Sequence, residues 1–192
     1  PAEIDSDPET NEVFIADGYG NRRVAVFDAQ TGDYKRHWGA YGNQPTDDPY
    51  TYDPDAASSQ QFGRPVHCAT LSNDGLVYVC DRVNDRIQVF ERDGTFLNEV
   101  VIAGRTLGFG SAFDVDFSPD AEQRYLYNID GMNQKVWLLN RTTLEIVGSF
   151  GFGGHAAGGF TAAHSLAVDA GGNIYVGETL EGKRVQRFVR TP

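Results

Sequence analysis

A phrase of two short strands joined by a polar turn recurs four times along this chain. Its copies read VFIADGYGNRRVAVF, VYVCDRVNDRIQVF, LYNIDGMNQKVWLL and IYVGETLEGKRVQRF. In each copy the first run ends at an acidic residue, and these residues are spaced by 64, 49 and 48 positions: Asp17, Asp81, Asp130 and Glu178. Apolar residues that alternate with period two between turn residues indicate antiparallel strands with one buried face. Repeats of about 40–50 residues built in this way predict a β-propeller.

The repeat divides the chain into four blades of one all-β domain, residues 1–192. We expect the blades at about residues 1–39, 64–102, 109–151 and 160–192. Residues 40–63 are rich in Gly, Pro and Asp without apolar periodicity, which predicts a surface loop over one face of the propeller. The first blade begins inside its inner strand and the last lacks its outer strand. We therefore expect the arc to belong to a six-bladed propeller whose remaining blades lie upstream.

The charge of the chain narrows the classes of partner. Its 27 acidic and 16 basic residues give a net charge of −11, which argues against nucleic acid and against an anionic membrane surface. No apolar run approaches the ~20 residues of a membrane-spanning helix. The chain starts at Pro1 rather than Met, which leaves a removed leader peptide open.

The two cysteines, Cys68 and Cys80, flank the turn Asn73-Asp74-Gly75 at equal distances from Asp74. If this turn joins two strands of a hairpin, the cysteines lie nearly opposite one another and a cross-strand disulfide can form. A register shift by one residue would instead place them on opposite faces. Two small buried thiols are an equally good interpretation, so the pattern leaves the redox compartment open.

The acidic residues that end each first run, together with Asn84, are interpreted as architectural. Their side chains can accept hydrogen bonds from backbone N–H groups of the tight turn, and a following arginine can pack beneath. Recurrence in every unit favours a structural role over a catalytic one.

Histidine does not recur in every unit and is therefore more informative. His67 and His164 stand at the head of the inner strand in units two and four, where unit three has Phe113 and unit one has about Ala2. Inner strands line the central channel of a propeller, so histidines on alternate blades of a six-bladed ring approach one another at one mouth. Three imidazoles with a fourth position open form a catalytic type of zinc site. The third would lie upstream; a polar lining residue is the plainer interpretation of each histidine.

Two further residues face the same mouth. Tyr19 and Arg82 lie in the turns that follow the second strands of units one and two. An exposed turn aromatic and a solvated guanidinium are the structural interpretations of these residues. Their position next to the predicted histidine pair makes them candidates for catalytic roles.

The segments DGYGNRRVAVF with YKRHWG, CDRVNDRIQVF and AHSLAVDAGGNIYVGE resemble NHL repeats. More narrowly, they resemble the peptidyl-α-hydroxyglycine α-amidating lyase family and its bacterial relatives. The resemblance covers nearly the whole chain and implies the last four blades of a six-bladed propeller. It also implies a zinc ion held by three histidines on alternate blades, and cleavage of an α-hydroxyglycine-extended peptide to an amide and glyoxylate.

By this resemblance His67 and His164 match the second and third zinc ligands, Tyr19 the active-site tyrosine and Arg82 an active-site arginine. The family's first histidine and second arginine would lie upstream. Two departures stand out. His67 follows Pro65-Val66 rather than a proline directly, and Ser165 replaces an aspartate that ligates calcium in the family. The second departure argues against a structural calcium ion.

Three hypotheses follow for the function. The first is a lyase-like metalloenzyme acting on a peptide or small molecule at the channel mouth. The second is a non-catalytic NHL propeller that binds a protein, peptide or glycan. The third is an assembly module whose open arc is completed by another chain. Because relatives of this kind are often exported bacterial proteins, we expect an extracellular or periplasmic location.

Overall fold

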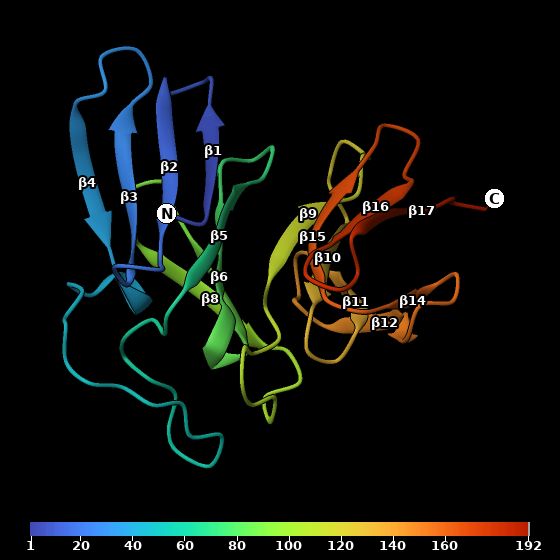
Figure 1. The fold of residues 1–192 in the computed structure, drawn as a ribbon. Helices are drawn as coiled ribbons and strands as arrows, with labels where there is room; N and C mark the ends of the chain where they lie inside the picture. Colours follow the sequence, from blue (N-terminus) through green and yellow to red (C-terminus); the bar gives the residue numbers. More distant parts are fainter. Residues whose placement is uncertain (192) are drawn as a thin grey trace.

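The computed structural model describes residues 1–191, and it is built almost entirely of β-strands (Figure 1). Four antiparallel sheets follow one another along an arc, with the sheet β1–β4 at one end and the sheet β15–β17 at the other. The inner strands contact one another in the order β1, β5, β9 and β15. This arrangement confirms the predicted all-β propeller arc of four blades, the last with three strands.

Each blade is a meander whose strands pair in chain order. Blade one contains the strands β1 Glu3–Asp7, β2 Glu12–Asp17, β3 Arg23–Asp28 and β4 Tyr34–Trp38. Blade two contains β5 Val66–Leu71, β6 Val77–Asp81, β7 Arg86–Phe90 and β8 Phe96–Val101. Blade three contains β9 Asp114–Phe117, β10 Tyr125–Asp130, β11 Lys135–Asn140 and β12 Ile146–Phe150. Blade four contains β15 Ala163–Val168, β16 Ile174–Glu178 and β17 Arg184–Phe188.

Two smaller types of element complete the fold. A short parallel pair, β13 Phe152–Gly153 and β14 Gly159–Phe160, connects blades three and four. Two single-turn 3-10 helices are present as well, η1 Ala40–Gly42 and η2 Arg82–Asn84. In residues 1–191 we find no helix with the length and apolar character needed to cross a membrane.

Apolar cores lie between successive blades. The alternating residues of the strands supply them, as shown by the fully buried Phe14 and Phe90 between blades one and two. Leu126 and Leu139 occupy the next interface, and Val176 lies in the last. Burial of each large apolar side chain contributes about 1.5–3 kcal/mol, so blade-to-blade packing fixes the strand heads that surround the channel.

The recurring acidic residues brace the turn between the second and third strands. Asp81 is fully buried and accepts hydrogen bonds from Arg86 Nε at 2.7 Å and Asn84 Nδ2 at 2.7 Å. In blade one, Asp17 accepts from Arg23 Nε at 2.8 Å. In blade four, Glu178 accepts from Arg184 Nε at 2.5 Å. These contacts agree with an architectural role for the acidic residues.

The loop of residues 40–63 is held against the turns of blade two. The hydroxyl of Tyr50 donates to Asn84 Oδ1 at 2.7 Å, and that of Tyr52 donates to the Gly104 carbonyl oxygen at 2.5 Å. Phe62, near the end of the loop, is completely buried in the core between blades one and two. The loop therefore covers the propeller face at which the β6–β7 turn lies.

The two cysteines form a disulfide bond. Cys68 on β5 lies directly opposite Cys80 on β6 in the strand pairing, and both side chains are fully buried. The structure thus selects the disulfide from the two interpretations that the spacing left open. The bond links the inner strand of blade two to its neighbour next to His67.

Candidate functional site

A β-bulge lies at each histidine of the channel mouth. The pairing of β5 with β6 passes from Val66 directly to Cys68, and that of β15 with β16 passes from Ala163 to Ser165. His67 and His164 are therefore the extra, unpaired residues of their strands. A bulge of this kind redirects one side chain out of the alternating pattern of a strand. The inner strands of blades one and three pair without such a shift.

The two redirected imidazoles meet. The ring centroids of His67 and His164 are 4.8 Å apart, and Phe113 packs against both at 5.7 and 5.8 Å. His67 Nδ1 lies 2.5 Å from the Phe113 carbonyl oxygen. Because a carbonyl oxygen only accepts, Nδ1 carries the proton, and the Nε2 lone pair remains free to bind a ligand. Metal-binding histidines are typically oriented by the same type of hydrogen bond.

The surroundings of both imidazoles favour their neutral form. Burial lowers the pKa of His67 to about 4, although its hydrogen bond to Phe113 acts in the opposite direction. Burial also lowers the pKa of His164, and the nearby charge of Arg82 lowers it further. A neutral imidazole is the form that binds a metal ion, so the lowered pKa values favour the form in which both rings can act as ligands.

Arg82 and Tyr19 lie beside the histidine pair. Arg82 Nη1 donates to the Tyr19 hydroxyl oxygen at 3.4 Å, and the Tyr19 ring is 5.9 Å from that of His67. Arg82 is only 7% exposed, and its Nε is buried without a hydrogen-bond partner among residues 1–191. Three aromatic rings surround its guanidinium, the nearest being Phe113 at 4.8 Å. Burial lowers the pKa of Arg82, and Tyr19 opposes this shift.

Two glycines position the histidine strands from the neighbouring blades. A Cβ on Gly18 would lie 2.0 Å from the carbonyl oxygen of Val66, the residue before His67. A Cβ on Gly131 would lie 2.5 Å from the carbonyl oxygen of Ala163, the residue before His164. Both glycines follow the acidic residue of their repeat, whereas the same position in blade two holds Arg82. Sequence reasoning missed this role, although the alternation of Gly, Arg and Gly after the acidic residue could have suggested it.

These side chains border a cavity of about 520 Å³ at the channel mouth. The turns of all four blades contribute to its walls, together with the connection between β8 and β9. Its lining includes Tyr19, Arg82, Phe109, Met132, His164 and Leu180. The structure therefore brings all four sequence-predicted residues, His67 included, into one cluster.

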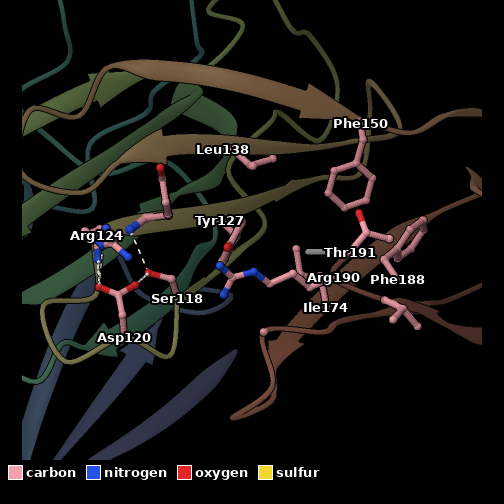
Figure 2. A pocket seen from close by; sticks show the side chains of 13 residues that line it. Ser118, Asp120, Arg124, Tyr127, Leu138, Phe150, Ile174, Phe188, Arg190 and Thr191 are labelled. Atoms are coloured by element: carbon pink, nitrogen blue, oxygen red, sulfur yellow. Dashed lines mark hydrogen bonds and ion pairs between the residues drawn. The ribbon is translucent and has the colours of Figure 1, made fainter.

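A second cavity, of about 470 Å³, opens between blades three and four (Figure 2). Phe150 and Phe188 pack together on one side, with ring centroids 4.8 Å apart. On the other side Asp120 accepts hydrogen bonds from Ser118 and Arg124, at 2.6 and 3.1 Å. This cavity lies at the β9–β10 turn, the opposite end of β10 from Met132. Its carboxylate is already paired, so we regard it as a crevice between blades.

The fit of a metal ion to the histidine pair can be judged from its donors. Two adjacent neutral imidazoles, one of them oriented by a backbone carbonyl, suit zinc as part of a ligand set. Within the described residues no group of three or more His, Cys, Asp or Glu side chains could hold a metal ion. His67 and His164 therefore fit as two members of a larger set, and a zinc site needs at least one further ligand.

Known proteins give this geometry a context. No protein-family model matches the chain. Over 187 residues it is 27% identical to peptidyl-glycine alpha-amidating monooxygenase B of Xenopus laevis, covering 93% of this chain and 19% of that protein. The corresponding mouse protein (Mus musculus) is 25% identical over 187 residues, with 93% and 17% covered. The chain thus spans about a fifth of the length of these relatives.

Solved structures show the same fold. Hydrazine synthase of Kuenenia stuttgartiensis superposes with a TM-score of 0.67 at 14% identity, covering 98% of this chain and 46% of that one. The WD40 β-propeller domain of Doa1 also gives 0.67, at 10% identity, with 99% and 51% covered. At such identities the likeness concerns the fold alone. The chain is therefore a four-bladed β-propeller arc whose sequence is similar to a part of the peptidylglycine alpha-amidating monooxygenases.

Proposed function

We propose that this propeller is part of a zinc-dependent lyase that cleaves a peptidyl-α-hydroxyglycine to a peptide amide and glyoxylate. The observation that carries the proposal is a single cluster at one cavity. It contains the buried imidazole of His67, the partly exposed imidazole of His164, a guanidinium without an ionic partner in residues 1–191, and a phenol hydroxyl. The relation to amidating monooxygenases supports the same chemistry.

Zinc would be held by His67 and His164, with a third ligand from outside residues 1–191. Bound there, the ion would supply Lewis acidity to a substrate oxygen. His67 would bind through Nε2, because Nδ1 is engaged by the Phe113 carbonyl oxygen. Burial lowers the pKa of each imidazole, which favours the neutral form that binds a metal ion. We do not assign a calcium ion to this chain.

Tyr19 and Arg82 would carry the proton and charge chemistry. The Tyr19 oxygen would take the proton from the α-hydroxyl group, and the C–N bond would break as the hydroxyl carbon becomes the aldehyde of glyoxylate. The Tyr19 hydroxyl would then pass that same proton to the departing amide nitrogen, so atoms and charge balance. Arg82 would hold the substrate carboxylate, which supplies the ionic partner that the guanidinium lacks within residues 1–191. A charge-assisted pair in a partly dehydrated cavity would orient the substrate for this step.

The test compares zinc content and glyoxylate release in the full-length protein. We expect about one zinc per chain, and a loss of at least tenfold in zinc affinity and in glyoxylate release for His67→Ala and for His164→Ala. His155→Ala, at an exposed position, is the matched control and should retain both. Residues 1–192 alone supply two imidazoles and should hold zinc weakly. Zinc retention after both substitutions would refute the metal site.

One observation favours a second candidate, a non-catalytic module that binds peptides. The cavity is bordered by exposed apolar side chains, which suit binding whether or not cleavage follows. Peptide binding without zinc and without glyoxylate release would favour this module. For either function we propose an extracellular or periplasmic location, supported by the Cys68–Cys80 disulfide, which persists in oxidising compartments.

A further inference from the structure

Large apolar side chains are exposed along one side of the candidate site. Phe109, Met132 and Leu180 are 61%, 42% and 73% exposed, and all three border the cavity that contains Arg82 and His164. They come from separate segments: the β8–β9 connection, the β10–β11 turn and the β16–β17 turn. We call these three residues the apolar wall. A concave apolar surface next to a few polar groups is typical of a ligand site.

Leu180 occupies an unfavourable backbone conformation. Its φ is 49°, in the left-handed region that disfavours residues with a bulky side chain. Hydrogen bonds of the turn hold it there: Thr179 N donates to the Ala162 carbonyl oxygen at 3.0 Å, and Gly182 N donates to the Thr179 carbonyl oxygen at 2.9 Å. With 73% of Leu180 exposed, packing offsets little of this cost. Backbone strain that packing does not offset is consistent with a functional role for the residue.

The apolar wall adjoins the guanidinium of Arg82, which has no ionic partner among the described residues 1–191. The guanidinium carbon of Arg82 lies 5.6 Å from the Phe109 ring centroid, so Phe109 borders both the charged and the apolar part of the cavity. Met132 is packed near Gly108, since a Cβ on that glycine would lie 3.3 Å from the Met132 methyl carbon. A ligand that fills the cavity therefore needs an anionic group for Arg82 and an apolar group for the wall.

We propose that the apolar wall binds the residue that precedes the α-hydroxyglycine and selects substrates in which that residue is large and apolar. The inference rests on the proposed function, which places the substrate carboxylate at Arg82. With the carboxylate there, the acyl part of the substrate extends from the cation along Phe109. Its burial against Met132 and Leu180 removes apolar surface of both partners from water and strengthens binding.

The test measures dissociation constants of unreactive N-acylglycines by calorimetry on the full-length protein. N-acetylglycine and N-benzoylglycine share the carboxylate and the amide and differ in apolar size. We expect the benzoyl compound to bind wild type at least about tenfold more tightly, because its ring buries more apolar surface. Leu180→Asn should reduce this ratio to about threefold or less, and Asn tolerates the left-handed conformation, so folding should persist.

Phe109→Ser is a second variant of the apolar wall, and it should also reduce the ratio of the two dissociation constants. Val147→Asn, on the outer strand β12, is the matched control for loss of an exposed apolar side chain and should leave the ratio unchanged. A wild-type ratio near one, or an unchanged ratio in both wall variants, would overturn the inference.

Parallel glyoxylate measurements with N-benzoyl-α-hydroxyglycine separate this inference from the proposed lyase. Tighter binding of N-benzoylglycine without glyoxylate release would support the inference about the apolar wall and contradict the proposed lyase activity. Glyoxylate release together with equal affinity for the two N-acylglycines would support the proposed lyase and contradict the inference about the apolar wall.

Discussion

Gly18 and Gly131 let the turns of blades one and three press against the backbone that carries each histidine. We predict that Gly18→Ala displaces His67 and destabilises the fold by about 1–3 kcal/mol, because the new Cβ would overlap the Val66 backbone. Zinc affinity of the full-length protein should fall at least tenfold. Gly20→Ala is the matched control, since a Cβ there meets no atom within 4 Å. Zinc titration and urea unfolding of both variants test this, and equal behaviour would contradict it.

The sequence predicted that His67, His164, Tyr19 and Arg82 lie together at one mouth, and the structure places them so, whereas the backbone that orients the histidines could not be predicted. His67 and His164 stood out because they head alternate inner strands, and the structure brings their rings together. The two bulges that redirect them depend on a single unpaired residue in each strand, which leaves the alternation of the remaining residues intact. The glycine contacts join segments of different blades, and a repeat period carries no information about such contacts.

At the scale of the element, the same turn motif is buried in blade two and open in blade one. Asp81 and Arg86 side chains are 0% and 2% exposed, whereas those of Asp17 and Arg23 are 17% and 35% exposed. We predict that Asp81→Ala costs about 3–5 kcal/mol, because it leaves a buried guanidinium without its closest carboxylate. Asp17→Ala should cost about 1 kcal/mol or less. Urea unfolding measures both, and similar costs would show that burial does not govern the motif.

Strands with clear periodicity were predictable, and very short elements were not. The expected second strands of the repeats match β2, β6, β10 and β16 closely, because each alternates and ends at its acidic residue. The pair Phe152–Gly153 and Gly159–Phe160 and the helical turn Ala40–Gly42 lie in Gly-rich or loop segments. Elements of two or three residues are too short to show a period, so tertiary contacts alone define them.

For the whole molecule, the central channel brings together carboxylates from blades that are distant in sequence. Glu3 and Asp5 come from blade one, and Asp114 and Asp116 from blade three. Asp114 Oδ2 and Asp116 Oδ2 accept hydrogen bonds from the backbone N–H groups of Leu166 and Val168, at 2.9 and 2.7 Å, which links β9 to β15. Asp5 Oδ2 links β1 to β5 in the same way, by accepting from Leu71 N at 2.8 Å. These carboxylates hold neighbouring inner strands together, and their proximity in the channel has an electrostatic cost.

Glu3 should make the stability of the arc depend on pH. Burial, followed by the charge of Asp114 across the channel, raises the pKa of Glu3 from 4.5 to about 8, although Thr70 Oγ1 donates to its carboxylate at 3.2 Å. Between these pH values the folded state binds the proton and the unfolded state releases it. The contribution of Glu3 to the free energy of unfolding is therefore complete below pH 4.5 and is lost as the pH rises through 8.

We therefore predict that Glu3→Gln, which cannot ionise, stabilises the protein at pH 9 relative to wild type by at least about 1 kcal/mol. One unit of pKa shift corresponds to about 1.4 kcal/mol, and the partial exposure of Glu3 reduces the full effect. At pH 4 the two proteins should differ little, since Glu3 is then protonated whether folded or unfolded. Urea unfolding at both pH values is the measurement, with Glu122→Gln at an exposed turn as the matched control. A Glu3→Gln protein that is less stable than wild type at pH 9 would show that the channel stabilises the ionised carboxylate, and that the carboxylates of the two blades do not repel one another across it.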